Sequence, residues 1–460
     1  MSDISSASAT VAAISTPPSA GGIGIVRISG EDAVAVADRV FRPTGPRPLS
    51  ALGGYRAAHG RVVFEGRDID ECVALVFRGP KSYTGEDVVE LCCHGGLFLL
   101  QTVLRAVLAA GAVPAAAGEF TKRAFLNGKL DLTEAEAVMD LIGAQSAQGA
   151  KAALSALDGA LSRKIRTLCG ELLGLSAQLA AWVDYPDDEI EELQTDALRE
   201  TLTRVETELS GLLSRFDAGR AVTEGVETAI IGKPNVGKSA LMNLLSGFGR
   251  SIVTDIAGTT RDVVEQTVRL GDLVLRLADT AGIHETSDVV ERIGVSRAKE
   301  KSERAGLVFA VFDRSEPLDE ADAQILALCR DKHVIAVLNK SDLPARADEA
   351  VIRASVPVCV PVCALNGDGL EQLEQAAAEL LCVNELDTDS GLLTTERQRQ
   401  DAEAALAAVR EAIGALDAGL TLDAVNVSMD DAIGRLLSLT GERVTDAVVD
   451  EVFSRFCVGK

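Results

Sequence analysis

One loop constrains the fold of this 460-residue chain more than any other feature: the segment Gly232-Lys-Pro-Asn-Val-Gly-Lys-Ser239. Its glycines let successive backbone N–H groups turn inward as an anion nest, Lys238 reaches outer phosphates, and the Ser239 hydroxyl suits magnesium. The apolar run Val226–Ile231 before it is typical of a buried strand. Ala240–Ser246 after it has the spacing of a helix that begins at the phosphates. This order predicts a P-loop nucleotide-binding domain.

A second motif, Asn339-Lys-Ser-Asp342, addresses the choice of base. It directly follows His333–Leu338, an apolar run that predicts a buried strand. A carboxylate accepts two hydrogen bonds at once, which suits the ring N–H and the exocyclic amine of guanine, whereas adenine offers no matching pair of donors. We therefore predict that Asp342 selects GTP over ATP.

Two further motifs lie between these. Asp279 of Asp279-Thr-Ala-Gly282 is placed to hold a magnesium-bound water, and the Gly282 N–H to contact the γ-phosphate. In the preceding run, Thr254–Asp262, Thr260 is the predicted second magnesium ligand beside Ser239. The four motifs together predict a set of GTP-binding residues: Asn235, Val236, Gly237, Lys238, Ser239, Ala240, Thr254, Asp255, Ile256, Ala257, Gly258, Thr259, Thr260, Asp279, Thr280, Ala281, Gly282, Asn339, Lys340 and Asp342.

Two positions depart from the usual GTPase pattern. Ile283 stands where Ras-type GTPases carry the Gln that orients the attacking water, so another group must do this. Cys363-Ala364-Leu365 stands where related GTPases usually have Ser-Ala, which leaves the packing of this segment against guanine open.

Charge and cysteine content narrow the class of protein. With 45 basic and 69 acidic residues the net charge is −24, which disfavours broad, sequence-independent nucleic-acid binding but allows a local basic patch. None of the nine cysteines forms a Cys-x-x-Cys pair. Cys92-Cys93-His94 lies in a strand-like run where neighbours face opposite ways, so buried reduced thiols are favoured over a metal site. These features predict a cytoplasmic protein.

No membrane segment is expected. The N-terminus lacks a charged region followed by an apolar core, which argues against a secretory signal. The most apolar stretch, Gly95–Gly118, is interrupted by Gln101, Arg105 and Pro114, so a clean span of about 20 residues is not available.

The distribution of strand-like and helix-like patterns along the chain predicts a multidomain α+β and α/β fold. Residues 1–128 mix short strands and helices, including strands at Arg61–Phe64 and Cys72–Phe77 joined across Glu65–Asp68. The Gly22-Ile-Gly24 run lacks the third glycine of a dinucleotide-binding fingerprint. Residues 129–220 and 383–460 are Ala/Leu-rich with helical periodicity, on either side of 221–382. We expect a discontinuous helical domain with a Ras-like P-loop GTPase domain inserted into it.

Several other segments carry a resemblance to a known family. They are Thr16-Pro-Pro18, Gly21–Gly30, Tyr83–Asp87, Phe125–Asp131 and the final Cys457-Val-Gly-Lys460. Together with the GTPase motifs, they make the chain resemble the MnmE (TrmE) family of tRNA-modification GTPases over essentially its whole length.

The resemblance implies that the parts of the chain have different functions. The N-terminal domain would form a homodimer and bind a one-carbon tetrahydrofolate, either 5-formyl- or methylene-tetrahydrofolate. With a flavin-dependent partner, MnmG, in a heterotetramer or larger complex, the chain would modify the wobble uridine of certain tRNAs at C5 with an aminomethyl- or carboxymethylaminomethyl-type group. The implied folate contacts are Arg27, Glu86, Lys129 and Lys460, and Cys457 is a candidate for a role at the modification site.

The resemblance also implies a potassium-activated GTPase whose GTPase domains dimerise. The potassium ligands would be Asn235, Thr254, Ile256 and Thr259, and Glu291 would be the catalytic residue, acting through a bridging water. The alternative is a ribosome-assembly or signalling GTPase. Assembly GTPases usually append a basic RNA-binding module, whereas this chain is acidic and carries the segments that resemble a folate site.

Overall fold

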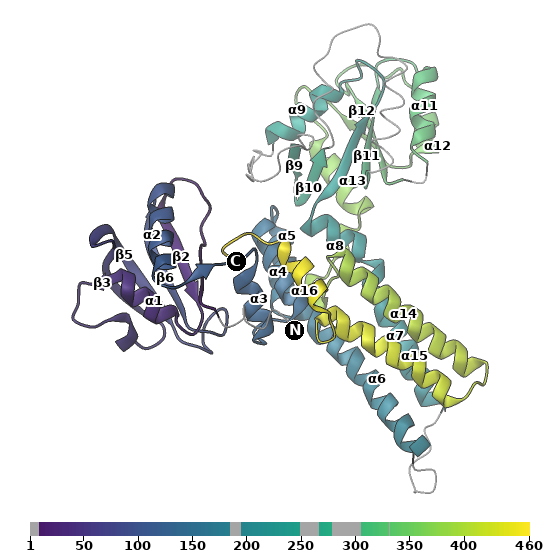
Figure 1. Ribbon diagram of the computed structural model, residues 1–460. Helices are drawn as coiled ribbons and strands as arrows, with labels where there is room; N and C mark the ends of the chain where they lie inside the picture. Colours follow the sequence, from purple (N-terminus) through teal and green to yellow (C-terminus); the bar gives the residue numbers. More distant parts are fainter. Residues whose placement is uncertain (1–8, 185–194, 249–265, 278–304, 331) are drawn as a thin grey trace. The chain divides into compact units, whose positions relative to one another are not determined.

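The computed structural model describes residues 9–184, 195–248, 266–277, 305–330 and 332–460 (Figure 1). The chain divides into two compact units, one of residues 1–139 with 437–460 and the other of residues 140–436. Among the described helices, none has the length and apolar character needed to cross a membrane.

The first unit is built on a seven-stranded sheet with the order β3-β4-β5-β6-β2-β1-β7. All neighbouring strands are antiparallel except β1 and β7, which are parallel. Its elements are β1 (Val11–Ile14), β2 (Gly21–Ser29), α1 (Ala33–Val40), β3 (Phe41–Pro43), η1 (Leu49–Ala51), β4 (Arg56–Phe64), β5 (Arg67–Phe77), β6 (Val88–Gly95), α2 (Leu97–Ala109), β7 (Val113–Pro114), α3 (Glu119–Leu126), α4 (Leu132–Gly143), which runs into the second unit, and α16 (Asp446–Ser454).

Alternation along the strands separates the two faces of this sheet. On β2, Val26 and Ile28 are fully buried with Leu91 of β6, in one core with Val36 of α1 and Val103 of α2. Because side chains alternate across a strand, the residues between them point to the opposite face. Arg27 therefore lies on the face that this core leaves free.

The hairpin between β4 and β5 is tighter than the sequence suggested. The predicted connection, Glu65–Asp68, is wrong at its end: only Glu65 and Gly66 form the turn, and β5 begins at Arg67. Both turn residues have positive φ, 50° and 76°, which fits a two-residue turn whose twist matches the strands. Asp68 is drawn into the strand, where its carboxylate pairs with Arg61.

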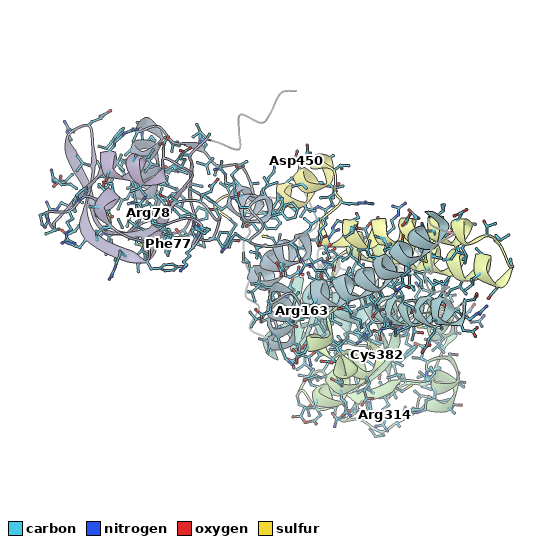
Figure 2. All side chains as sticks on the ribbon, turned by 90° about the horizontal axis from the view of Figure 1, so that it is seen from below. Phe77, Arg78, Arg163, Arg314, Cys382 and Asp450 are labelled. Carbon is cyan, nitrogen blue, oxygen red and sulfur yellow. The ribbon has the colours of Figure 1, made fainter. Side chains whose placement is uncertain are left out.

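The last residues of the chain belong to the first unit. Val458 forms an isolated antiparallel bridge with Ala117, and the N–H of Phe120 donates to a main-chain oxygen of Lys460 at 3.1 Å. Helix α16 contacts α3, where the Lys122 Nζ lies 2.6 Å from the carboxylate of Asp450, which Figure 2 labels.

The helices of the second unit come from both sides of the nucleotide-binding segment. They are α5 (Ala147–Leu157), α6 (Ala160–Asp184), α7 (Thr195–Ser214), α8 (Phe216–Thr223), α14 (Glu396–Asp417) and α15 (Leu422–Thr440), the last of which runs into the first unit. Helix α7 packs along α14, far away in sequence, and buries Leu198, Leu202, Val205, Leu209 and Leu212 at the spacing of one helical face. The two helical stretches therefore pack together.

The described residues of the segment that carries the P-loop form a six-stranded sheet with the order β13-β12-β11-β8-β10-β9, parallel except for the edge strand β9. Its elements are β8 (Val226–Ile231), α9 (Lys238–Phe248), β9 (Gln266–Leu270), β10 (Leu273–Leu277), β11 (Leu307–Asp313), α11 (Glu320–Leu328), β12 (Val334–Asn339), α12 (Glu349–Ser355), β13 (Cys359–Val362), α13 (Leu370–Leu380), η2 (Val383–Glu385) and η3 (Thr388–Ser390).

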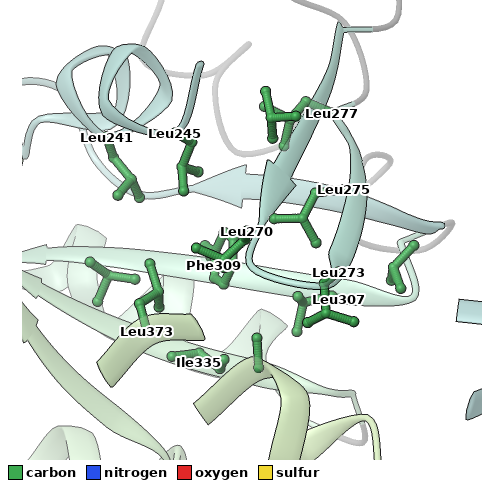
Figure 3. Packing of buried hydrophobic residues seen from close by; sticks show 14 of the residues in the cluster. Leu241, Leu245, Leu270, Leu273, Leu275, Leu277, Leu307, Phe309, Ile335 and Leu373 are labelled. Atoms are coloured by element: carbon green, nitrogen blue, oxygen red, sulfur yellow. The ribbon is translucent and has the colours of Figure 1, made fainter. Parts of the chain in front are cut away.

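Helices cover both faces of this sheet, which explains why its central strands β11 and β12 are apolar up to their last residue. On β11, Phe309 packs in one core with Leu241 and Leu245 of α9 and Leu373 of α13 (Figure 3). The neighbouring Phe312 packs in a second core with helices α11 and α12. The predicted strand Val226–Ile231 is confirmed as β8, and the predicted fold class, α+β with helical and inserted α/β parts, is confirmed as well.

Candidate functional site

The loop between β8 and α9 has the backbone that phosphate binding requires. Gly232 and Gly237 have φ of 153° and 97°, and a Cβ at Gly237 would lie 2.1 Å from the Asn339 side-chain nitrogen. Asn235 also has positive φ, 64°, a conformation that asparagine tolerates better than most residues. The N–H groups of the loop and the first turn of α9 therefore converge where an anion is best stabilised.

Lys238 is held in place by this loop. Its Nζ donates to the carbonyl oxygens of Gly232 and Lys233, at 2.8 and 2.7 Å. Burial lowers the pKa of this lysine below its usual value. A phosphate arriving beside the ammonium would favour its charged form. The side chain is therefore oriented before a nucleotide binds.

The predicted guanine motif is joined to the P-loop by hydrogen bonds. The side-chain nitrogen of Asn339 donates to the Val236 carbonyl at 2.8 Å, and its oxygen accepts from the Ala364 N–H at 3.1 Å. The thiol of Cys363 donates to the Asp342 carboxylate at 3.2 Å. These hydrogen bonds join three segments that are separated by as many as 128 positions, from Val236 to Ala364.

Lys340 completes this arrangement. Its ammonium pairs with Asp313 at the end of β11, and Asp313 also accepts from the backbone N–H and hydroxyl of Ser315. Lys340 itself has a φ of 62°. The ion pair holds the stem of the lysine beside the segment that carries Asp342.

The remaining predicted nucleotide and metal residues lie outside the described residues. They are Thr254, Asp255, Ile256, Ala257, Gly258, Thr259, Thr260, Asp279, Thr280, Ala281, Gly282, the departure Ile283, and Glu291. Of the predicted cation ligands, Asn235 and Ser239 are described, and both are exposed. Within the described ranges, no three His, Cys, Asp or Glu side chains are grouped as a metal site, and this includes Cys92, Cys93 and His94.

A second candidate site lies in the first unit around Arg27 of β2. Its Nε donates to the Glu90 carboxylate, directly opposite on β6, at 2.8 Å, and both side chains are 15% exposed. The guanidinium carbon lies 5.6 Å from the centroid of the Tyr83 ring and 5.3 Å from that of Phe120. Among the described residues, the buried Arg27 Nη1 has no hydrogen-bond partner, an unusual state for a buried polar atom.

The chain end brings a second cation to this place. Burial, and then the positive charge of Arg27, lower the pKa of Lys460 below its usual value, while Glu90 acts in the opposite direction. Lys460 therefore lies close enough to Arg27 and Glu90 to interact electrostatically with both. The guanidinium of Arg27 and the ammonium of Lys460 are the groups here that can bind an anionic ligand.

The other predicted folate residues are placed differently. The Glu86 carboxylate accepts from Arg123 Nη1 with both oxygens, at 3.1 Å each, and from the Ser29 hydroxyl at 2.7 Å. Lys129 is exposed and donates to the Pro80 carbonyl at 3.2 Å. Cys457 is an exposed free thiol. Arg27 and Lys460 therefore lie near each other. Glu86 instead forms an ion pair with Arg123, whose side chain is 4% exposed.

Glu90, Tyr83, Phe120 and Arg123 are site residues that the sequence prediction missed. One signal was present: Arg27 and Glu90 are single charges of opposite sign, each inside an apolar strand run. A charge in such a run is expected to have a partner. The register that places the two opposite each other was not available from the sequence.

Comparisons with known proteins agree on one family. The model for the MnmE helical domain matches residues 132–457, and the model for the GTP-binding protein TrmE N-terminus matches residues 10–129. The tRNA modification GTPase MnmE of Acetivibrio thermocellus is 40% identical over 459 residues, 98% of this chain and 99% of that relative. That of Geobacillus kaustophilus is 42% identical over 458 residues, again 98% and 99%.

Solved structures also include similar chains. A crystal structure of Era in complex with MgGDPNP and part of 16S ribosomal RNA is 32% identical, covering 34% of this chain and 56% of that one, with a TM-score of 0.26.

Proposed function

Because the chain belongs to the MnmE family, we propose that it is a GTP-hydrolysing enzyme of tRNA modification that acts on the wobble uridine. The observation that carries this proposal is whole-length identity to MnmE relatives, 40% over 98% of the chain. The linked P-loop and guanine motif support the GTPase part, because they supply a phosphate nest and a carboxylate with the chemistry for guanine.

The residues of the proposed GTP site have distinct roles in GTP hydrolysis. Lys238 and the loop N–H groups bind the phosphates, and Asp342 binds the base. Ser239 and Thr260 would hold magnesium, with Asp279 acting through a bound water, and the cation neutralises charge on the phosphates. Glu291 would orient the attacking water, since Ile283 has no polar group to do so.

We further propose that potassium binds Asn235 together with Thr254, Ile256 and Thr259 when two GTPase domains meet. The exposed Asn235 amide at a turn with positive φ is consistent with an oxygen ligand offered outward. A cation there would neutralise charge on the transferred phosphoryl group.

For the folate site we propose the cluster around Arg27 and Lys460. A tetrahydrofolate with a carboxylated tail suits two half-buried cations, one with an unpartnered Nη1, and the Tyr83 and Phe120 rings offer apolar surface. Glu86 would accept from pterin amino groups through its remaining lone pairs, and Lys129 would lie beside it. The donor would be 5-formyl- or methylene-tetrahydrofolate, and Cys457 would lie near the one-carbon chemistry.

The proposed organisation follows the four segments 1–128, 129–220, 221–382 and 383–460. We propose a cytoplasmic homodimer that acts with the flavin-dependent MnmG on tRNA. The added group would be of the aminomethyl or carboxymethylaminomethyl type at C5.

Deleting the gene is expected to remove the wobble-uridine modification, because no folate-linked enzyme would remain to build it. The measurement is mass spectrometry of nucleosides from digested tRNA. Complementation with the intact chain should restore the modified nucleoside, and complementation with Lys238→Ala should not. A deletion strain with a normal wobble-uridine profile would contradict the proposed substrate.

GTP hydrolysis is expected to be at least about tenfold faster in potassium than in sodium, since the ligand cage must fit one cation size. Asn235→Ala should remove this difference without abolishing nucleotide binding, because Lys238 and the loop N–H groups remain. Steady-state phosphate release in matched chloride buffers measures it. Equal rates in the two salts would show that no selective cation takes part.

A further inference from the structure

The second residue of the P-loop, Lys233, is tied to a helix outside the loop. Its Nζ lies 2.8 Å from Asp319 Oδ2 and 2.7 Å from Asp322 Oδ2, at the start of α11. The Lys233 side chain is 11% exposed and that of Asp322 is 3% exposed. Lysine is rarely so buried without a charged partner, and here it has two.

The two aspartates already form the cap of α11. Asp319 Oδ1 accepts from the N–H of Asp322 at 3.1 Å, and Asp322 Oδ2 accepts from the N–H of Asp319 at 3.1 Å. In this reciprocal capping box the carboxylates lie close together and repel. The ammonium of Lys233 bridges them and removes that repulsion.

Lys233 and the two aspartates at this cap stabilise each other's charged forms. Burial lowers the pKa of Lys233, but hydrogen bonds to Asp319 and Asp322 outweigh it, so its pKa lies above the usual value. The hydrogen bond from Lys233 also lowers the pKa of Asp319. The pair is therefore ionised at neutral pH.

The backbone of Lys233 serves the phosphate site. Its carbonyl is one of the two that hold the Lys238 ammonium, the other being that of Gly232. At the far end of the loop, Asn339 holds the Val236 carbonyl. The side chain of Lys233 thus holds the start of the loop, and the side chain of Asn339 holds its end near Val236. Lys238, which follows this segment, is oriented by it.

We propose that Lys233 is a positioning residue for the GTP reaction: by bridging Asp319 and Asp322, it fixes the carbonyls that orient Lys238 toward the phosphates. Lys233 acts through Lys238 and does not touch the nucleotide. The inference rests on the proposed function only in that the chain binds and hydrolyses GTP.

The test is nucleotide binding by the full chain. Lys233→Met keeps the length of the side chain but removes the bridge, which leaves the buried Asp322 carboxylate without its cation. We expect the Kd for fluorescent GTP and GDP analogues to rise about tenfold, as for the loss of one hydrogen bond to a charged group. Lys233→Arg should restore most of the affinity, because a guanidinium also bridges two carboxylates.

A matched control is available directly after β11. Arg314, which Figure 2 labels, forms an ion pair with Glu349 at 2.8 Å. In the described part of the chain, its side chain forms no hydrogen bond to the P-loop. Arg314→Met removes an ion pair with a similar N···O distance and should leave both Kd values unchanged. In a Lys238→Ala background, Lys233→Met should add less than twofold, because its effect is transmitted through Lys238.

Two results would overturn the proposal: unchanged nucleotide affinity in Lys233→Met, or equal losses with and without Lys238. If Lys233→Met does not fold, Asp319→Asn decides, since that side chain is 55% exposed. A loss of threefold or more at an unchanged melting temperature supports the proposal, and unchanged binding overturns it. None of these measurements uses tRNA, so failure here is distinguishable from failure of the proposed tRNA modification.

Discussion

Replacing Asp342 by Asn is expected to lower the affinity for GTP about a thousandfold, because one hydrogen bond to a carboxylate is lost, the other loses its charge, and two donors come to face each other, changes together worth about 4 kcal/mol. The asparagine oxygen can still accept from one guanine donor, but its amide nitrogen then faces the other. Xanthine carries a carbonyl where guanine carries the exocyclic amine. The variant should therefore bind xanthosine triphosphate better than GTP, as equilibrium titration with both nucleotides would reveal.

The same site offers a graded control. Cys363→Ala removes only the weak thiol donor to Asp342, so it should weaken GTP binding by a few-fold and leave the preference for guanine intact. Asp342 is exposed, so neither change should alter the free energy of unfolding much. If Asp342→Asn kept its preference for GTP over xanthosine triphosphate, the assigned role of this carboxylate would be wrong.

Replacing Arg27 by Met is expected to weaken binding of 5-formyl-tetrahydrofolate about a hundredfold, the loss of one to two hydrogen bonds from a cation. Methionine preserves much of the apolar stem against Tyr83 and Phe120, but it removes the ion pair of Arg27 with Glu90. Because that pair is only 15% exposed, the variant should also lose stability, by roughly 3 kcal/mol. Isothermal titration of the folate and chemical unfolding measure the two effects separately.

Two controls separate ligand binding from folding in this experiment. Arg42→Met removes an ion pair whose arginine side chain is 60% exposed, and it should change neither quantity by much. Arg27→Lys keeps the charge and should recover stability more fully than folate affinity, since lysine has no planar fork. GTP binding should be unaffected in all three variants. Folate binding by Arg27→Met at the parental affinity would refute the location of the site.

The nucleotide-binding segment was predictable because its chemistry is local in sequence. β8 agrees with the predicted strand at both ends, and β12 is shifted by one residue from the predicted run His333–Leu338. Central strands covered on both faces are largely apolar, and the turns that follow β8 and β12 carry the P-loop and the guanine motif. Such segments can be recognised without knowing what they contact.

The rest depended on contacts that no local pattern encodes. The Arg27–Glu90 pair needs the register of β2 on β6, and the Lys233 bridge needs the position of α11 beside a loop 86 residues away from Asp319. Glu86 was assigned from the family resemblance, whereas the structure shows that both of its carboxylate oxygens already accept from Arg123. In each case the decisive partner is remote in sequence.

The inclusion of residues 437–460 in the first compact unit has a consequence for biosynthesis. The strands of this unit leave the ribosome early, but the segment that pairs with Ala117 and Phe120 follows about 340 residues later. At roughly 5–20 residues per second, that delay is about 17–68 s. The first domain to be synthesised is thus among the last to be completed. A chain that stops short of Lys460 lacks one of the two cations beside Glu90, so truncated products cannot assemble this site.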